Sequence, residues 1–112
     1  MDAFEALYAT VIDRKENPSE GSYTRYLFDK GLDKILKKVG EECAETIIAA
    51  KNGDKGETIY EIADLFYHVM VMMAASDIGI DEVKAELEKR SEKSGNLKEF
   101  HVTDKNSCAK LL

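Results

Sequence analysis

A group of acidic residues in the middle of the chain is spaced so that helices would gather their carboxylates. Glu42 and Glu45 lie three residues apart, and Glu61 and Asp64 repeat that spacing further along the chain. Residues three apart share one face of a helix, so each pair can reach one ion. Four carboxylates from two packed helices would form an oxygen-rich cage that suits Mg²⁺ or Mn²⁺ better than zinc or copper. Glu41, one turn before Glu45, is placed to hold a water molecule and accept its proton.

These acids also have a simpler interpretation. Glutamates on a helix surface are usually solvated and paired with lysines, which would account for the cluster at Glu41 to Glu45. Glu61 and Asp64 are harder to explain in this way, because apolar residues surround them in the sequence. A carboxylate in apolar surroundings must lose its charge, find a cation or bind a metal. His68 continues the stripe of Glu61 and Asp64, either as a hydrogen-bonded core histidine or as a ligand contact.

Other kinds of site lack their motifs. The sequence has no paired Glu-x-x-His motifs for a di-iron centre, no His-Glu-x-x-His for a zinc protease and no Walker-type glycine loop. Its two cysteines, Cys43 and Cys108, have neither zinc-site spacing nor a disulfide framework, and neither resembles a nucleophile. We therefore expect a reduced, cytoplasmic protein.

Hydrophobic periodicity and glycine positions predict an all-α fold. The expected helices cover residues 4–12, 23–30, 32–52, 57–76 and 81–92, with Ser22 and Asp81 as N-caps of the second and the fifth. We expect one domain over residues 1–95. Residues 96–112 are expected to form a C-terminal tail that is weakly ordered or contacts a partner.

The two long helices should position the acids. The helix over 32–52 has an apolar face with a second one opposite, so we expect it to be buried on two sides. The first face comprises Leu32, Ile35, Val39, Cys43, Ile47 and Ala50, and the second comprises Ala44 and Ile48. The helix over 57–76 is apolar nearly all round, as in an interior helix. One of its sides comprises Ile59, Ile62, Ala63, Phe66, Val69, Met70 and Met73.

Charge and size limit the partners. The 112 residues include 16 Lys and Arg against 22 Asp and Glu, giving a net charge of −6. Nucleic-acid-binding domains usually carry a basic face, so we expect no nucleic-acid partner. We also expect no membrane segment, because no apolar run reaches the roughly 18 residues that span a bilayer. Two long apolar helices have more apolar surface than one small bundle can cover, which predicts a homodimer.

The acidic motif resembles that of a known superfamily. The segments Glu41-Glu42-Cys43-Ala44-Glu45 and Glu61-Ile62-Ala63-Asp64 match the E-E-x-x-E … E-x-x-D signature of the all-α, MazG-like nucleoside triphosphate pyrophosphohydrolases. Within that superfamily the chain is most similar to the phosphoribosyl-ATP pyrophosphohydrolase family over about residues 5–95. That closer resemblance rests on Ser22-Tyr23-Thr24, Lys37-Lys38-Val39-Gly40-Glu41-Glu42 and Ala63-Asp64-Leu65-Phe66-Tyr67-His68.

This resemblance implies a bundle that assembles as a homodimer. It also implies Mg²⁺-dependent hydrolysis of the α–β phosphoanhydride of 1-(5-phosphoribosyl)-ATP, the second step of histidine biosynthesis. Glu42, Glu45, Glu61 and Asp64 would ligate the metal. The other implied or candidate substrate-binding positions are Lys34 and Lys38 for phosphates, Ser22, Tyr23 and Thr24 for ribose or phosphate, His68 as a further substrate contact, and Arg90 for a phosphate across a subunit interface.

Two alternatives stay open at this stage. A house-cleaning dNTP pyrophosphatase would use the same metal chemistry on a different nucleotide. A non-catalytic helical dimerisation module would use the acids only to solvate its surface.

Overall fold

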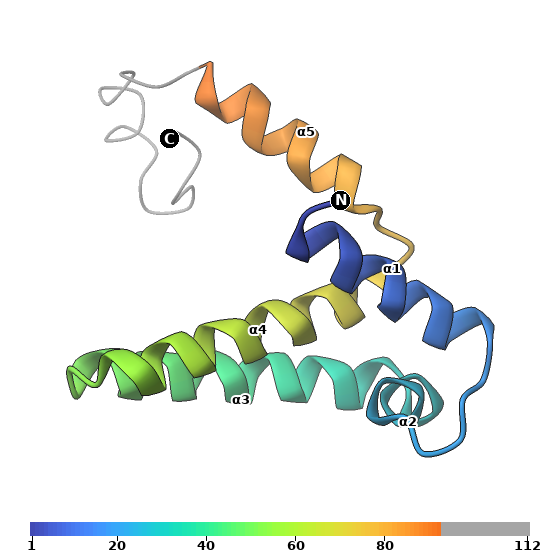
Figure 1. Ribbon diagram of the computed structural model, residues 1–112, viewed down its shortest axis with the longest axis horizontal. Coiled ribbons are helices and arrows are strands. Elements are labelled where there is room, and N and C mark those ends of the chain that lie inside the picture. Colours follow the sequence, from blue (N-terminus) through green and yellow to red (C-terminus); the bar gives the residue numbers. More distant parts are fainter. Residues whose placement is uncertain (93–112) are drawn as a thin grey trace. The chain divides into compact units, whose positions relative to one another are not determined.

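The computed structural model describes residues 1–92, which form five α-helices and no strand. The helices are α1 (Ala3–Glu16), α2 (Tyr23–Lys30), α3 (Leu32–Lys51), α4 (Lys55–Ala75) and α5 (Ile80–Ser91) (Figure 1). The predicted all-α class is therefore confirmed for the described residues. Residues Met1–Ile78 form one compact unit, and a second unit begins at Gly79 with α5. The predicted tail over 96–112 and the domain boundary at 95 lie outside the described residues.

Capping side chains explain where the helices begin. Ser22 caps α2 as predicted, with its Oγ accepting a hydrogen bond from the backbone N–H of Arg25 at 3.2 Å. Asp54 caps α4 by accepting from the N–H of Glu57 at 3.0 Å. The helix therefore begins at Lys55, two residues before the predicted start.

The predicted cap of α5 is wrong. Asp81 lies inside the helix, and the N-cap residue is Gly79. The carboxylate of Glu82 accepts a hydrogen bond from the Gly79 N–H at 2.7 Å, which satisfies one of the free donors at the helix start.

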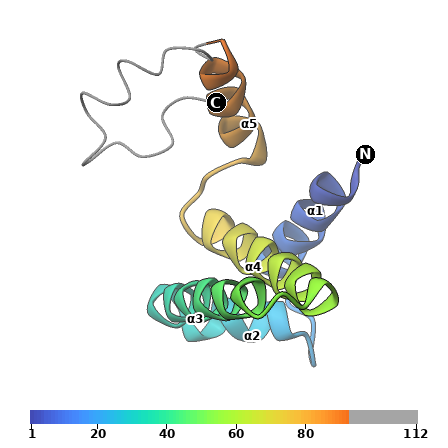
Figure 2. The same ribbon diagram turned by 90° about the vertical axis from the view of Figure 1, so that its left-hand side faces the viewer.

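The helices α3 and α4 form an antiparallel pair that carries the acidic residues. They lie side by side along most of their length, as the two perpendicular views show (Figures 1 and 2). Gly53 turns the chain between them with a φ of 73°, a left-handed conformation that glycine adopts without a steric cost.

The core of the first unit takes residues from each of its four helices. Val11 of α1, Leu27 of α2, Ile35 of α3, and Val71 and Ala74 of α4 are at most 1% exposed. Full burial of such an aliphatic side chain contributes roughly 1.5–3 kcal/mol. This cluster lies toward the C-terminal half of α4, so it anchors one end of the α3–α4 pair.

The predicted burial of α3 on two sides is wrong for the single chain. Its buried residues, Ile35, Glu42 and Ala49, lie on one face, which packs against α4. The predicted apolar faces are largely exposed, with Ile47 at 68% and Ile48 at 59%. Glu42 and Ile35 lie two turns apart, which places them on the same side of the helix. The face of α3 that is buried therefore carries an acidic residue.

The exposure of apolar side chains on α4 changes along the helix. Met70, Val71 and Met73 are buried, whereas Ile59 and Phe66 are 58% and 44% exposed. By length and composition α4 could cross a membrane, a description that the core helix of a globular protein also fits. Its C-terminal half lies in the core and its acids face α3, so we interpret α4 as the core helix of the bundle.

Candidate active site

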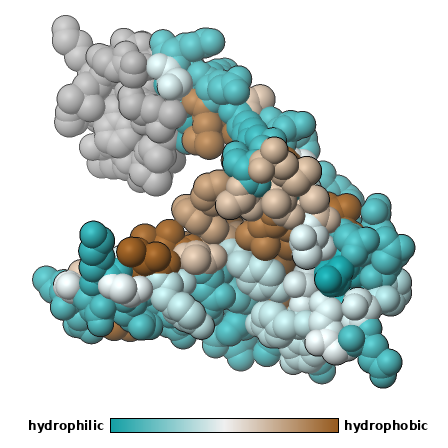
Figure 3. All heavy atoms as spheres, in the orientation of Figure 1, coloured by the Kyte–Doolittle hydropathy of each residue, from teal (hydrophilic) through white to brown (hydrophobic). Residues whose placement is uncertain are grey.

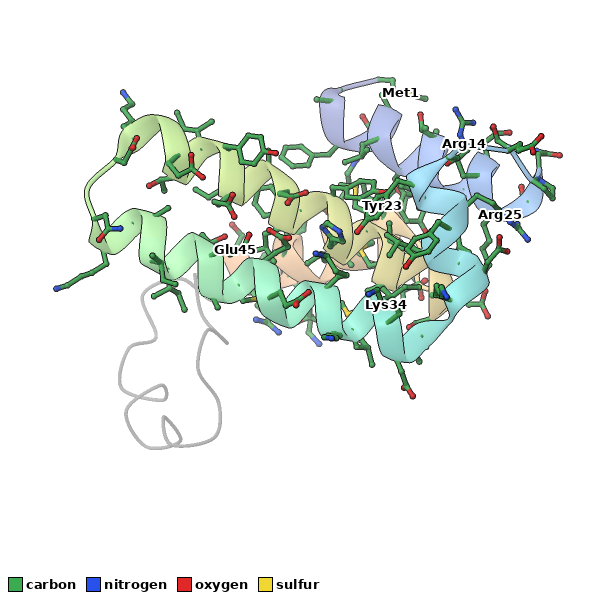
Figure 4. The ribbon with its side chains drawn as sticks, turned by 90° about the horizontal axis from the view of Figure 1, so that it is seen from below. Met1, Arg14, Tyr23, Arg25, Lys34 and Glu45 are labelled. Atoms are coloured by element: carbon green, nitrogen blue, oxygen red, sulfur yellow. The ribbon has the colours of Figure 1, made fainter. Side chains whose placement is uncertain are left out.

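The acidic residues meet where α3 packs against α4. Carboxylate oxygens of Glu42, Glu45 and Glu61 lie within 4.8 Å of one another. Oxygens of Glu42 and Asp64 and a ring nitrogen of His68 form a second group within the same distance. Glu42 belongs to both groups. Figure 4 shows the helix pair with Glu45 on α3 labelled.

Two of these carboxylates are buried and incompletely paired. Glu42 is 3% exposed and Glu61 is 6% exposed. Among the described residues, Glu42 Oε2 and Glu61 Oε2 are buried oxygens without a hydrogen-bond partner. A buried, unsatisfied charged group costs more than the 1–3 kcal/mol or so of a neutral one. The fold therefore maintains an unfavourable arrangement here, which is typical of a functional site.

Burial and the close approach of these carboxyl groups change their pKa values. Burial, followed by the neighbouring carboxyls of Asp64 and Glu45, raises the pKa of Glu42 to about 7. The pKa of Glu61 also rises to about 7, first because its carboxyl shares a hydrogen bond with Glu45 and then because of burial. That hydrogen bond to Glu61 lowers the pKa of Glu45. At neutral pH the cluster therefore holds protons that a cation would displace.

This donor set fits a hard divalent cation. Carboxylate oxygens are the ligands that Mg²⁺ and Mn²⁺ prefer, and the unpaired oxygens of Glu42 and Glu61 are available to such an ion. Glu45 lies at the exposed edge of the cluster. Asp64 is half-buried on the opposite helix and joins Glu42 in the second group, so the four predicted carboxylates fall in two groups that share Glu42.

Thr46 is part of this site and was not identified from the sequence. Its hydroxyl donates to the backbone carbonyl of Glu42 at 2.7 Å and lies 3.3 Å from that of Glu61 on α4. The threonine therefore sits at the contact between the two acid-bearing turns. A threonine inside a helix gives no sequence signal for this role, because such hydroxyls commonly bond within their own helix.

The lysines and Glu41 border the cluster. Lys38 Nζ lies 3.6 Å from Glu42 Oε1 and 3.4 Å from Glu41 Oε1. Burial lowers the pKa of Lys38, but Tyr23, Glu41 and Glu42 outweigh burial and raise it, so the lysine keeps its charge. Glu41 itself is exposed and lies outside both groups of metal-compatible atoms. Lys34, one turn before Lys38, is half-buried on α3 (Figure 4).

A chain of polar contacts connects α2 to the cluster. The Nδ1 of His68 lies 2.8 Å from the backbone carbonyl of Asp64 and 3.5 Å from its carboxylate. A carbonyl only accepts, so His68 donates from Nδ1, and in the neutral ring Nε2 is then the acceptor. The Tyr23 hydroxyl, 3.2 Å from Nε2, is then the donor. His68 is 2% exposed with both nitrogens engaged, so it positions its neighbours rather than offering a surface for ligand.

Thr24 and Ser22 lie on or next to α2, whereas Arg90 lies on α5. The hydroxyl of Thr24 is hydrogen-bonded to that of Tyr67, which is not among the predicted site residues. Ser22 serves as the cap of α2. Arg90 lies on α5, in the second unit, where its Nε donates to Glu86 at 3.0 Å. The structure therefore brings α2 together with the acids and leaves Arg90 outside this first unit.

Replacement of Tyr23 by phenylalanine should destabilise the protein by about 1 kcal/mol, because His68 Nε2 loses its donor. Urea unfolding monitored by circular dichroism would measure the change. Tyr26→Phe is the matched control, since the contacts of Tyr26 with Tyr23 and Lys30 are made through its ring. Equal stability of the two variants would contradict the proposed contact.

Comparison with known proteins identifies the family. The family model for phosphoribosyl-ATP pyrophosphohydrolase matches residues 4–91. The chain belongs to this family. It is 57% identical over 102 residues to the phosphoribosyl-ATP pyrophosphatase of Clostridium botulinum, covering 91% of this chain and 93% of that protein. The corresponding enzyme of Streptococcus thermophilus is 54% identical over 101 residues, covering 89% and 97%.

One relative is a longer protein. A histidine biosynthesis bifunctional protein of Lactococcus lactis is 52% identical over 101 residues, which span 90% of this chain but 48% of that protein. Together with the family model, these matches confirm the predicted family and the predicted enzyme class, a hydrolase of histidine biosynthesis. The acidic cluster, Tyr23 and His68 all lie inside the matched range.

Proposed function

We propose that this chain hydrolyses the α–β phosphoanhydride of 1-(5-phosphoribosyl)-ATP, releasing pyrophosphate and 1-(5-phosphoribosyl)-AMP. The observation that supports this most directly is the buried cluster of Glu42, Glu45, Glu61 and Asp64, with two unpaired oxygens, in a member of this family. A non-catalytic dimerisation module would have no use for buried, unpaired carboxylates, which cost stability.

The four carboxylates would hold Mg²⁺ or Mn²⁺. A divalent cation bound there supplies positive charge that polarises the phosphoanhydride and offsets the charge developing on the leaving pyrophosphate. The chain supplies the cage from two helices whose relative position is fixed by the core. With the cation bound, the cage can attract the substrate phosphates even though the protein has a negative net charge.

The residues around the cage have separate roles in this proposal. Glu41 accepts the proton of the attacking water from the exposed side of α3. Lys38, held between Glu41 and Glu42, contacts a substrate phosphate, and Lys34 extends the same basic edge. Its ion pairs keep the Lys38 ammonium beside the carboxylates, where the phosphates must arrive.

The helix α2 forms the other wall of the site. Tyr23 and Thr24, linked to His68 and Tyr67 respectively, fix this helix against α4 and face the ribose or its phosphate. Ser22 contributes to this wall by capping the start of α2. His68 acts through Tyr23 and Asp64, and Arg90 would reach a phosphate only from another subunit.

Pyrophosphate release tests the reaction. With Mg²⁺ present, we expect release from phosphoribosyl-ATP and little from a panel of dNTPs. A clear preference for any dNTP would refute the proposed substrate and favour a house-cleaning pyrophosphatase. Omission of the divalent ion should abolish the activity, and readdition of Mg²⁺ or Mn²⁺ should restore it.

We also propose that the protein is a cytoplasmic homodimer. The α3 surface exposes Leu32, Leu36, Ile47 and Ile48, and a second apolar surface lies between α1 and α4. At the latter, a groove of about 360 Å³ is bordered by Phe4 and Phe66, whose rings meet edge to face at 5.5 Å. Figure 3 shows hydrophobic atoms over α4 on this side. Exposed apolar areas of this kind commonly mark protein interfaces.

The α3 surface is the proposed dimer contact. Ile47→Glu should convert the dimer to monomers without loss of helix content, because Ile47 is 68% exposed in the single chain. Sedimentation equilibrium measures the mass, and Ile47→Leu, which keeps an apolar side chain at this position, is the matched control. A monomeric unmodified protein, or a dimer that survives Ile47→Glu, would refute this contact.

A further inference from the structure

A cavity of about 720 Å³ opens beside the start of α2, and Ser22 and Tyr23 form part of its lining. Its walls include the loop from Pro18 to Gly21 and the side chains of Tyr23 and Tyr26. Volumes of this size are typical of sites for nucleotide-sized ligands. The cavity therefore has room for a part of the substrate that lies away from the phosphates.

Two aromatic rings form part of its surface. Tyr23 and Tyr26 stack with centroids 6.0 Å apart and planes 23° from parallel, and they are 46% and 42% exposed. Tyr23 also reaches His68 through its hydroxyl, and His68 contacts Asp64. One side chain thus borders the cavity and ends beside the acidic cluster. Tyr23 and His68 therefore connect the cavity to the acids.

The side chains that line the cavity include two acids and one base, and a cation already lies near one of its aromatic rings. Of the described side chains that line it, Glu20 and Asp29 are acidic and Arg25 is the one base. The guanidinium of Arg25 is engaged by Asp29 at 3.0 Å and by the Lys15 carbonyl at 2.8 Å. The ring of Tyr26 already has a cation nearby, with Lys30 Nζ 5.6 Å from its centroid. Electron-rich aromatic faces beside carboxylates attract cations.

The substrate offers such a cation at its base. In 1-(5-phosphoribosyl)-ATP the second ribose is attached to N1 of adenine. Alkylation at N1 leaves the adenine ring protonated and positively charged in neutral water, whereas the bases of ATP and the common dNTPs are uncharged there. A site that binds a cationic ring would therefore distinguish this substrate from the much more abundant ATP.

We propose that Tyr23 and Tyr26 bind the N1-alkylated adenine of the substrate as a cation and so determine specificity. The base stacks on the exposed tyrosine rings, with the side chains of Glu20 and Asp29 nearby. The exposed Lys30 ammonium swings into water as the base arrives. This inference rests on the proposed function, because it takes its ligand from that reaction.

Two isomeric nucleotides test the role of charge without the second ribose. N1-methyl-AMP carries the positive charge, and N6-methyl-AMP has the same mass but a neutral ring. With Mg²⁺ at neutral pH, we expect N1-methyl-AMP to bind about fivefold more tightly, from a cation–π contribution of about 1 kcal/mol. Calorimetry and competitive inhibition of hydrolysis both report this ratio. Equal affinity of the two isomers in the unmodified protein would overturn the proposal.

Variants of Tyr26 test whether its ring is responsible for the preference for N1-methyl-AMP. Tyr26→Leu should remove most of it, and Tyr26→Phe, which keeps an aromatic face, should retain it. Inhibition by inorganic pyrophosphate, a probe of the phosphate end, should be the same in both variants. A preference that survives Tyr26→Leu in a folded protein would overturn the assignment to these rings. Hydrolysis of phosphoribosyl-ATP without any preference for N1-methyl-AMP would leave the proposed function standing, whereas absent hydrolysis would refute that function instead.

Discussion

Replacement of Glu61 by glutamine is expected to lower hydrolysis about a thousandfold and to raise the melting temperature of the metal-free protein. The carboxylate is 6% exposed and one of its oxygens has no hydrogen-bond partner among residues 1–92. A neutral amide removes the cost of keeping a charge there but no longer supplies a metal ligand, which corresponds to a loss of about 4 kcal/mol in the transition state. Activity and stability should therefore change in opposite directions.

Glu57→Gln provides the matched control. Glu57 lies one turn earlier on α4, and its side chain is exposed and outside the acidic cluster. We expect this variant to keep nearly full activity and an unchanged melting temperature. Calorimetric titration with Mg²⁺ should detect binding to the control and none to Glu61→Gln. Retention of a tenth or more of the activity by Glu61→Gln would exclude this carboxylate as an essential ligand.

The metal-free protein should become less stable as the pH rises from about 5 to 8. In the folded chain the pKa values of Glu42 and Glu61 are raised to about 7, above the 4.5 of an ordinary glutamate. Between these values the folded state binds more protons than the unfolded state, so the free energy of unfolding falls with rising pH. This stabilisation is complete below pH 4.5 or so and is lost as the pH passes 7. We expect the melting temperature to fall by several degrees.

Mg²⁺ should reverse this trend. The ion binds ionised carboxylates, so its affinity rises with pH and its binding releases protons. At a concentration about a hundred times its dissociation constant it would add about 2.7 kcal/mol, or about 10 °C or more at pH 8. Scanning calorimetry at several pH values, with Mg²⁺ or with a chelator, measures both effects. The double variant Glu42→Gln/Glu61→Gln should lose both, whereas a pH slope that persists in it would assign the effect to other groups.

The sequence by itself determined the helical class, the family and the acids of the candidate site. Spacing of three residues places Glu42 with Glu45, and Glu61 with Asp64, on shared helix faces whatever the rest of the chain does. The start of α2 followed from Ser22, because a capping side chain acts locally. These features depend on residues within one or two turns of one another.

Only the tertiary structure decided which faces meet. On a helix wheel the apolar stripe of α3 was the better candidate for burial, yet Ile35 is the one member of that stripe that is buried, together with Glu42 and Ala49. Helical periodicity fixes the angles between residues on one helix but not the rotation of one helix against another, which the whole core sets. For the same reason, the contacts of Thr46 between the two helices and of Tyr23 with His68 could not be predicted from the sequence. The raised pKa values of Glu42 and Glu61 likewise exist because packing places carboxylates of α3 and α4 together out of water.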